Sequence, residues 1–439
     1  MSVTSPGKDG TPDGPSSANS APSPRPHDPY AAWRSRDFRY YLGGQFCSQV
    51  AGAMQTVAIS WEIWKRTEDP MALAWVGLVQ AAPVMAFSLP AGHVADRVDR
   101  RRIIMTVLLV QALVALALAA LSWWNGPLAL IYACLFVAGV DRAFLAPAGA
   151  AMLPRLVPRE VFPNAVTWRS SLFQFSAVAG PALGGVALAV LPHPALIYVA
   201  NACAISVFFG FLANLAPQPP AGVQEAPGWD SLVAGLRFVW NTKIILAAIT
   251  LDLFAVLFGG ATALLPIYAK EILHQGAIGF GQLRAAPGFG AILMGLYLAH
   301  QPPLRRAGRT LLLAVTGFGA ATIVFGVSTS FWLSLAMLCI CGALDQVSVV
   351  VRHTLVQTRT PDHMRGRVSA VNMVFISASN ELGEFESGVV ARLFTPVVSA
   401  VSGGVGTLLV VLAVAGRWPE LRRLGPLVEQ QRPAPPADG

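Results

Sequence analysis

The chain has 439 residues, of which 54% are hydrophobic and only 12% are charged. A typical soluble domain carries roughly 25% charged residues, so this composition excludes a single soluble core and indicates a membrane protein. The net charge is +8, but the cations fall in short links between apolar runs, so membrane topology explains them and nucleic acid is not an expected partner. The five cysteines lie inside apolar runs without metal-ligand spacing, so we expect no metal site.

In chain order, residues 1–32 are rich in Ser and Pro and are expected to form a disordered cytoplasmic tail. Apolar runs of about 20 residues, long enough to cross a bilayer as helices, then follow. The expected spans are 40–64, 72–94, 103–123, 127–148, 167–191, 195–216, 243–269, 279–300, 310–328, 331–352, 367–395 and 397–416.

These spans predict an all-α membrane protein with 12 transmembrane helices in two pseudo-symmetric six-helix bundles. The bundles are expected at residues 33–216 and 243–416, with a cytoplasmic linker at 217–242 and a cytoplasmic tail at 417–439. Arginines precede every odd-numbered span, for example at 34–39 and 97–102, and also follow the twelfth span at 417–423, whereas they are nearly absent from the other links. Because short cationic links stay in the cytoplasm, both termini are expected there.

An internal repeat supports the division into two halves. The segment Gly77–Pro83 resembles Gly281–Pro287, 204 residues further on, and Asp141 and Asp345 share that offset. Gly and Pro at one constant offset are typical of duplicated transporter halves.

The link after the second span reads Gly92-His-Val-Ala-Asp96-Arg97-Val-Asp-Arg100-Arg101. It resembles the signature loop of the major facilitator superfamily, a resemblance that implies a secondary transporter. Asp96 is then expected to accept from amides at the start of the eleventh span, with the arginines completing a charge network that closes the cytoplasmic side. The alternative is that these charges only set the topology.

A second motif lies in the fifth span, Ser176-Ala-Val-Ala-Gly180-Pro181-Ala-Leu-Gly184-Gly185. It resembles the Gly/Pro element of exporter-type members of the superfamily, which implies proton-coupled efflux. Pro181 is expected to bend the helix, and the glycines to let a neighbouring helix approach. The alternative is an ordinary packing helix.

Ionisable residues inside spans are costly and therefore indicate function. Asp252 and Glu384 are the first candidates for the proton-carrying residue, since a buried carboxyl group can load and release a proton. Gln45 and Gln49, four residues apart, are expected to line a cavity. The remaining candidates for proton coupling or substrate binding are Glu381, Asp141, Arg142 and Asp345, and Asp141 or Asp345 could instead belong to a static ion pair.

The segments 364–372, 379–388 and 38–44 resemble the enterobactin exporter group of the superfamily. The resemblance implies a proton-driven exporter of a siderophore or drug-like amphiphile in the bacterial inner membrane, working by alternating access and without a cofactor. The expected partners are a small-molecule substrate, protons and membrane lipid, and the protein is expected to be a monomer and not an enzyme. The alternative is a nutrient importer or facilitator of the same superfamily.

Overall fold

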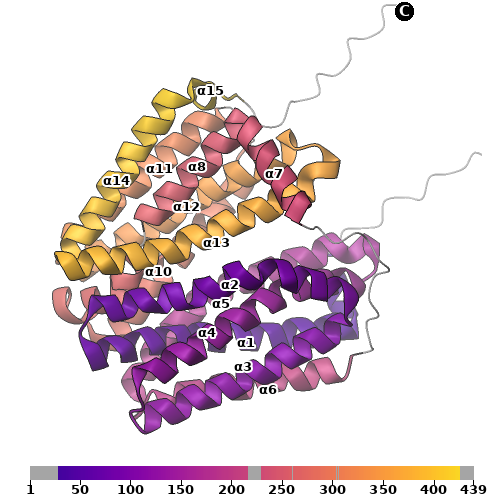
Figure 1. The fold of residues 1–439 in the computed structure, drawn as a ribbon, viewed down its shortest axis with the longest axis vertical. Helices are drawn as coiled ribbons and strands as arrows, with labels where there is room; N and C mark the ends of the chain where they lie inside the picture. The colour runs from indigo at the N-terminus through magenta and orange to yellow at the C-terminus, as the bar shows by residue number, and fades with distance from the viewer. Residues whose placement is uncertain (1–27, 216–228, 260, 303, 305, 426–439) are drawn as a thin grey trace, which may run out of the picture.

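The computed structural model describes residues 28–215, 229–259, 261–302, 304 and 306–425, and this part of the chain is helical throughout (Figure 1). The first half contains α1 Arg36–Thr67, α2 Pro70–Arg97, α3 Arg100–Trp123, α4 Leu128–Met152, α5 Phe162–Val190 and α6 Ala195–Ala213. The second contains α7 Trp229–Asn241, α8 Lys243–Phe258, α9 Leu265–Ile267, α10 Gly276–Ala299, α11 Ala307–Val327, α12 Phe331–Arg359, α13 Asp362–Leu393, α14 Pro396–Arg417 and α15 Pro419–Arg422.

These helices confirm the expected fold class. The seventh span is interrupted, because α8 is followed by a 3₁₀ turn at Ala261–Leu264, by α9 and by a π-helical turn at Tyr268–Ile272. The remaining parts of the expected tails and linker, residues 1–27, 216–228 and 426–439, lie outside the described residues.

A side chain just before each of the first three long helices caps the helix that follows. Ser35 Oγ accepts from Phe38 N at 3.4 Å, Asp69 Oδ1 from Met71 N at 2.9 Å, and Asp99 Oδ1 from Arg101 N at 2.8 Å. Each side chain satisfies an amide that has no partner inside the first turn of its helix. Asp99 therefore begins α3 only two residues after α2 ends.

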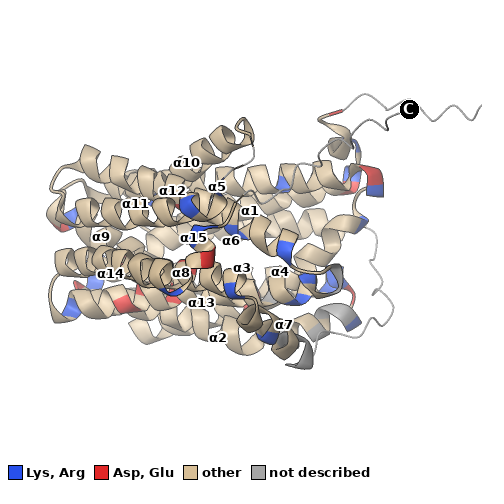
Figure 2. Ribbon diagram, turned by 90° about the horizontal axis from the view of Figure 1, so that it is seen from above, with Lys and Arg blue, Asp and Glu red and all other residues tan. Residues whose placement is uncertain are grey.

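Nine spans in the described part of the chain are long and apolar enough to cross a membrane. The three long helices outside that set are α1, α10 and α13, which contain more polar or small residues along their length. Figure 2 shows that most of the ribbon is uncharged, as a structure surrounded by lipid requires.

The two halves repeat the same packing. The pair α2 and α4 corresponds to α10 and α12, and the pair α3 and α6 corresponds to α11 and α14. In the first pair, a Cβ on Gly139 would lie 2.6 Å from Gln80 O; in its counterpart, a Cβ on Gly342 would lie 1.9 Å from Pro287 O. Glycine thus permits the same close approach beside Pro83 and Pro287, the prolines of the sequence repeat.

The halves meet along α2 with α13 and along α5 with α10. We name the two ends of the bundle by residues in the links. The Glu68 end holds the α1–α2 link together with the end of α13, and the Asp99 end holds the α2–α3 link together with the end of α6. Figure 1 shows the α2 and α13 ribbons close together at one end and separating toward the other.

Candidate transport site between the two halves

An ion pair joins the two halves near the middle of α13. Arg142 on α4 donates from Nη2 to Glu381 Oε1 at 2.5 Å. The Arg142 side chain is 49% exposed and that of Glu381 is 16% exposed, so the pair lies at an opening and not inside either half. The contact joins elements 239 residues apart and depends on how the halves are placed.

A second carboxylate lies one helical turn further along α13. Glu384 Oε1 is 3.7 Å from Arg284 Nη2 on α10 and accepts from Thr262 Oγ1 at 3.2 Å. Arg284 Nη1 also donates to Thr262 O at 3.2 Å. Glu381 and Glu384 therefore each face an arginine. The arginine beside Glu381 belongs to the first half, and the arginine beside Glu384 belongs to the second half.

Gly77 on α2 lies directly against this pair of carboxylates. A Cβ there would lie 3.3 Å from Glu381 O and 3.3 Å from Glu384 Cβ. The absence of a side chain lets α2 approach α13 at the level of Glu381 and Glu384. The sequence repeat singled out Gly77, but it gave no reason for its position.

Asp141 does not pair with its neighbour Arg142, because adjacent residues on a helix point in different directions. It is 6% exposed, and its Oδ2 has no hydrogen-bond partner among the described residues. Gln45 is similar, since its Oε1 is buried without a partner there, and Gln49 is half-buried. These polar groups of the first half stay candidates for contacts with a substrate.

Asp252 lies in a separate cluster inside the second half. Its carboxylate pairs with Arg352 on α12 and accepts from Ser348 Oγ at 3.4 Å. Both charged side chains are almost fully buried, at 4% and 5% exposed. Asp345 lies on the same helix face, one turn before Ser348. Sequence reasoning missed Arg352, although a charge so far inside an apolar helix was a usable signal.

Glu62 and Arg66 form another buried network, in the first half. They pair across one turn of α1, and Tyr198 on α6 donates to Glu62 Oε2 at 2.6 Å. Arg66 also donates to Leu121 O and Ser122 O at the end of α3 and to Gly126 O, in the link to α4, at 3.1 Å. Arg66 was also missed, and its spacing of four residues from Glu62 was the available signal.

Two further ion pairs tie the halves together at the Glu68 end. Lys270 Nζ is 2.7 Å from Glu68 Oε1, and Arg392 Nη1 is 3.1 Å from Asp69 Oδ1. The hydrogen bond from Lys270, with the charge of that ammonium group, holds the pKa of Glu68 below its ordinary value of 4.5. The adjacent residues Glu68 and Asp69 thus contact the ends of two different spans of the second half.

Glycines of the fifth-span motif lie at helix contacts. A Cβ on Gly180 would lie 3.0 Å from Val50 O, and one on Gly184 would lie 3.0 Å from Met54 Cα, both on α1. A Cβ on Gly185 would lie 2.8 Å from Gly281 Cα on α10. The glycines therefore let α5 approach both α1 in its own half and α10 in the other, while Pro181 lies buried inside α5.

The signature loop at the Asp99 end makes different contacts from those we expected. Arg100 Nη1 donates to Ala151 O at 3.1 Å, and Arg101 donates to Leu212 O and Ala213 O at 3.0 and 2.6 Å. These carbonyl groups end α4 and α6, where the helix dipole favours a cation. In this structure Arg101 thus contacts the end of α6, and the charge network expected between the loop and the start of α13 stays a prediction.

The described contacts of the loop do not join Gly92 to the start of α13. A Cβ on Gly92 or on Gly366, at the start of α13, would meet nothing within 4 Å. Arg97 is exposed, and the side chain of Asp96 lies outside the described residues. The described contacts between α2 and α13 lie instead toward the Glu68 end, as at Gly77 and Gly388.

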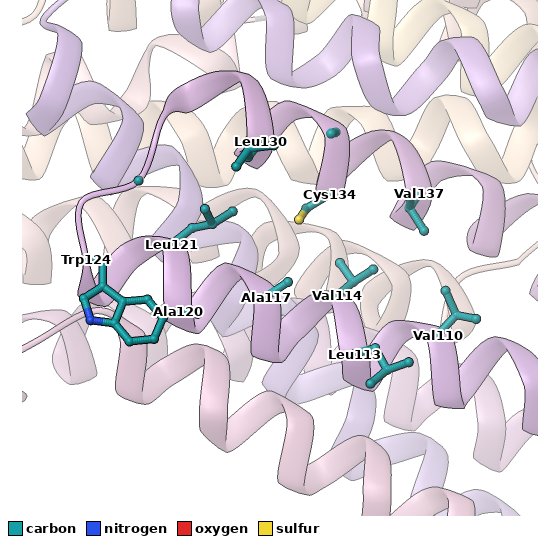
Figure 3. A pocket seen from close by; sticks show the side chains of 12 residues that line it. Val110, Leu113, Val114, Ala117, Ala120, Leu121, Trp124, Leu130, Cys134 and Val137 are labelled. Atoms are coloured by element: carbon teal, nitrogen blue, oxygen red, sulfur yellow. The ribbon is translucent and has the colours of Figure 1, made fainter.

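An apolar groove of about 590 Å³ lies between α3 and α4 (Figure 3). It is lined by residues such as Leu113, Ala117, Trp124 and Val137, with no charged side chain. Trp124 is 78% exposed and Leu113 is 58% exposed on the outer surface of the bundle. The groove lacks the polar groups that orient a transported substrate, so it is not part of the candidate site.

The family assignment follows from comparison with known proteins. The chain matches the transmembrane secretion effector family over residues 27–429. It belongs to this family of major facilitator superfamily transporters. The enterobactin exporter EntS of Citrobacter koseri is 26% identical over 406 residues, covering 92% of this chain and 95% of EntS. EntS of Shigella boydii is 25% identical over 390 residues, covering 88% and 92%.

Solved structures share the fold at much lower identity. A POT family transporter in complex with 5-aminolevulinic acid has a TM-score of 0.68 at 11% identity, covering 88% of this chain and 97% of that one. A bacterial homologue of the human lysosomal transporter Spinster, inward-facing and unoccupied, has a TM-score of 0.66 at 14% identity, with coverages of 88% and 97%. The transporter is thus a multi-pass membrane protein of the superfamily fold.

Proposed function

We propose that this transporter exports a small molecule from the bacterial cytoplasm in exchange for protons. The observation that carries the proposal is a pair of Glu/Arg contacts on α13: Glu381 with Arg142 across the boundary between the halves, and Glu384 with Arg284 inside the second half, one helical turn away. Charged groups inside a membrane-spanning bundle are costly and therefore indicate function, and relative movement of the halves would make and break the contact between Glu381 and Arg142. The relationship to enterobactin exporters supports export and a siderophore-like substrate.

In this proposal the Asp99 end faces the cytoplasm, as the arginine distribution indicates, and the two six-helix halves are the moving units. The halves are tied together at the Glu68 end by Glu68–Lys270 and Asp69–Arg392, while at the Asp99 end a Cβ on Gly92 or on Gly366 would meet nothing within 4 Å. This arrangement is the inward-facing state. In the outward-facing state, Asp96 would reach the start of α13 and close the cytoplasmic side.

Glu384 is the proposed proton carrier. As a carboxylate it faces Arg284 and Thr262; after accepting a proton it no longer attracts the guanidinium group, which is then available to an anionic or polar substrate. Arg142 and Glu381 are proposed to hold the halves together and to separate as the site changes sides. Asp141, Gln45 and Gln49 are proposed to contact the substrate, while Asp252 and Asp345 are proposed to stabilise the second half.

The test is uptake of radiolabelled enterobactin by everted membrane vesicles with an acidic interior. Uptake is expected with the wild type and is expected to disappear when nigericin with potassium collapses the pH gradient. Glu384→Gln is expected to lose gradient-driven uptake but to keep exchange of enterobactin across vesicles without a gradient. Glu386→Gln is the matched control, because Glu386 lies on the same helix and its described contacts include no ion pair.

Uptake that survives a collapsed gradient would remove the claim of proton exchange. Accumulation in intact cells, with no uptake in everted vesicles, would replace the exporter by an importer. Failure of enterobactin alone, with gradient-driven uptake of other siderophores or of an amphiphilic drug, would change only the substrate.

A further inference from the structure

A hollow of about 710 Å³ lies at the outer surface of the second half, between the α7–α8 junction and the α14–α15 junction. It is separate from the contacts between the halves. Its lining combines two cations, Lys243 and Arg417, with two indole rings, Trp240 and Trp418, and one carboxylate, Glu420. We propose that this hollow binds the headgroup of an anionic glycerophospholipid.

The charged groups fit a phosphate diester. Lys243 is the first residue of α8, and Thr242 makes no side-chain cap to the first turn of that helix. The backbone amides there, with the positive end of the helix dipole, favour an anion beside the Lys243 ammonium group. Arg417 lies across the hollow with its guanidinium carbon 5.8 Å from the centre of the Trp418 ring. Glu420 offsets one of the two cations, and the remaining balance is positive.

The shape of the hollow favours a lipid over a free phosphate ion. Lys243, Leu246 and Thr250 share one face of α8, so the hollow follows this helix for two turns, roughly 10 Å at 1.5 Å per residue. A phosphate ion would fill only the cationic end, whereas a lipid would place its headgroup there and the start of its acyl chains along Leu246. Trp240 is 70% exposed, and indole rings at this level are typical of the boundary between headgroups and acyl chains.

The test is a titration of the purified transporter in detergent, read by native mass spectrometry. The lipids are phosphatidylglycerol and phosphatidylcholine with identical acyl chains, and sn-glycerol 3-phosphate serves as a headgroup without chains. We expect phosphatidylglycerol to bind at least tenfold more tightly than phosphatidylcholine, and glycerol phosphate not to compete with it. Equal binding of the two lipids, or competition by glycerol phosphate at the same concentration, would overturn the proposal.

The site is located by a charge-matched pair of variants. Lys243→Gln with Arg417→Gln is expected to weaken phosphatidylglycerol binding roughly thirtyfold, since each cation near an anionic headgroup contributes about 1 kcal/mol. Arg102→Gln with Arg159→Gln removes the same charge from exposed positions elsewhere and is expected to leave the affinity unchanged. Equal affinity of both double variants would show that the lipid binds elsewhere.

A second measurement does not depend on the charge variants folding. Brominated phosphatidylglycerol is expected to quench the fluorescence of Trp240 and Trp418 in the wild type. Trp240→Phe with Trp418→Phe is expected to lose this component of the quenching. Quenching that is unchanged in the double Phe variant contradicts the assignment.

Discussion

Arg142 and Glu381 connect α4 of the first half with α13 of the second. If the pair holds the halves in register, Arg142→Gln is expected to lower the rate of enterobactin exchange in proteoliposomes roughly tenfold, equivalent to about 1.4 kcal/mol in the barrier. The exchanged pair Arg142→Glu with Glu381→Arg is expected to recover part of that loss. No recovery would show that each side chain has a separate role.

Variants of Asp252 and Arg352 test whether this buried pair of charges stabilises the fold or carries a proton. Asp252→Asn leaves the guanidinium group buried without its counterion, which is expected to destabilise the protein by about 3–5 kcal/mol. Asp252→Leu with Arg352→Met removes both charges and is expected to cost less, measured as thermal unfolding in detergent. If the double variant is stable but loses gradient-driven transport, Asp252 carries protons after all.

The contact between Glu68 and Lys270 predicts how the opening of the Glu68 end depends on pH. Its pKa is lowered by Lys270, so the contact stabilises the closed Glu68 end above the ordinary pKa of 4.5 and is lost as the pH falls through the lowered pKa. Spin labels at Trp124 and Leu393, both exposed at this end, are expected to move apart below about pH 4.5. Lys270→Met is expected to remove the pH dependence. A label distance that does not change with pH in the wild type would contradict this prediction.

The partners of charged residues were harder to predict than their positions. The sequence places Asp141 beside Arg142, yet Arg142 turns to Glu381, because the direction of a side chain on a helix sets its neighbours. The roles of Arg352 and Arg66 likewise depend on networks that include residues on other helices, Asp252 and Tyr198 among them. Such contacts depend on tertiary packing, which one sequence without its homologues does not specify.

At the level of helices, α5 packs against α1 in its own half and against α10 in the other half. Gly185→Val would place its side chain against Gly281 Cα and Ala277 O, so α5 and α10 would have to separate. We expect this variant to lose about 1–3 kcal/mol of stability, or to open the Glu68 end, measured by unfolding and by the Trp124–Leu393 label distance. Gly210→Val on α6 is the control, because a Cβ there meets nothing within 4 Å. Equal stability and equal label distances in both variants would show that the α5–α10 contact does not hold the halves together.

Individual helices were largely predictable, because their length and apolar character are set by the bilayer. The interruption of the seventh span between Phe258 and Leu265 was missed, although Gly259, Gly260 and Pro266 beside it were a usable signal. The close contact of Gly185 with α10 also could not be assigned to a partner from sequence. The motif indicated close packing but did not identify which helix approaches.

At the level of the whole molecule, the repeated pairs of helices make the two halves alike, while contacts between them lie toward the Glu68 end. Two similar units joined along α2–α13 and α5–α10 can rock about a site near Glu381 and Glu384. The sequence repeat predicted the two halves, whereas the helices along which they are joined could be seen only in the structure.

Alternating access requires the two ends to move in opposite directions, which distance measurements between spin labels test most directly. One pair of labels at Trp124 and Leu393 reports the Glu68 end, and another at Val98 and Gln357, both exposed, reports the Asp99 end. Shifting the protein with Glu384→Gln or with bound enterobactin is expected to lengthen the first distance while shortening the second. Distances that change together, or a second distance that never shortens, would contradict the account.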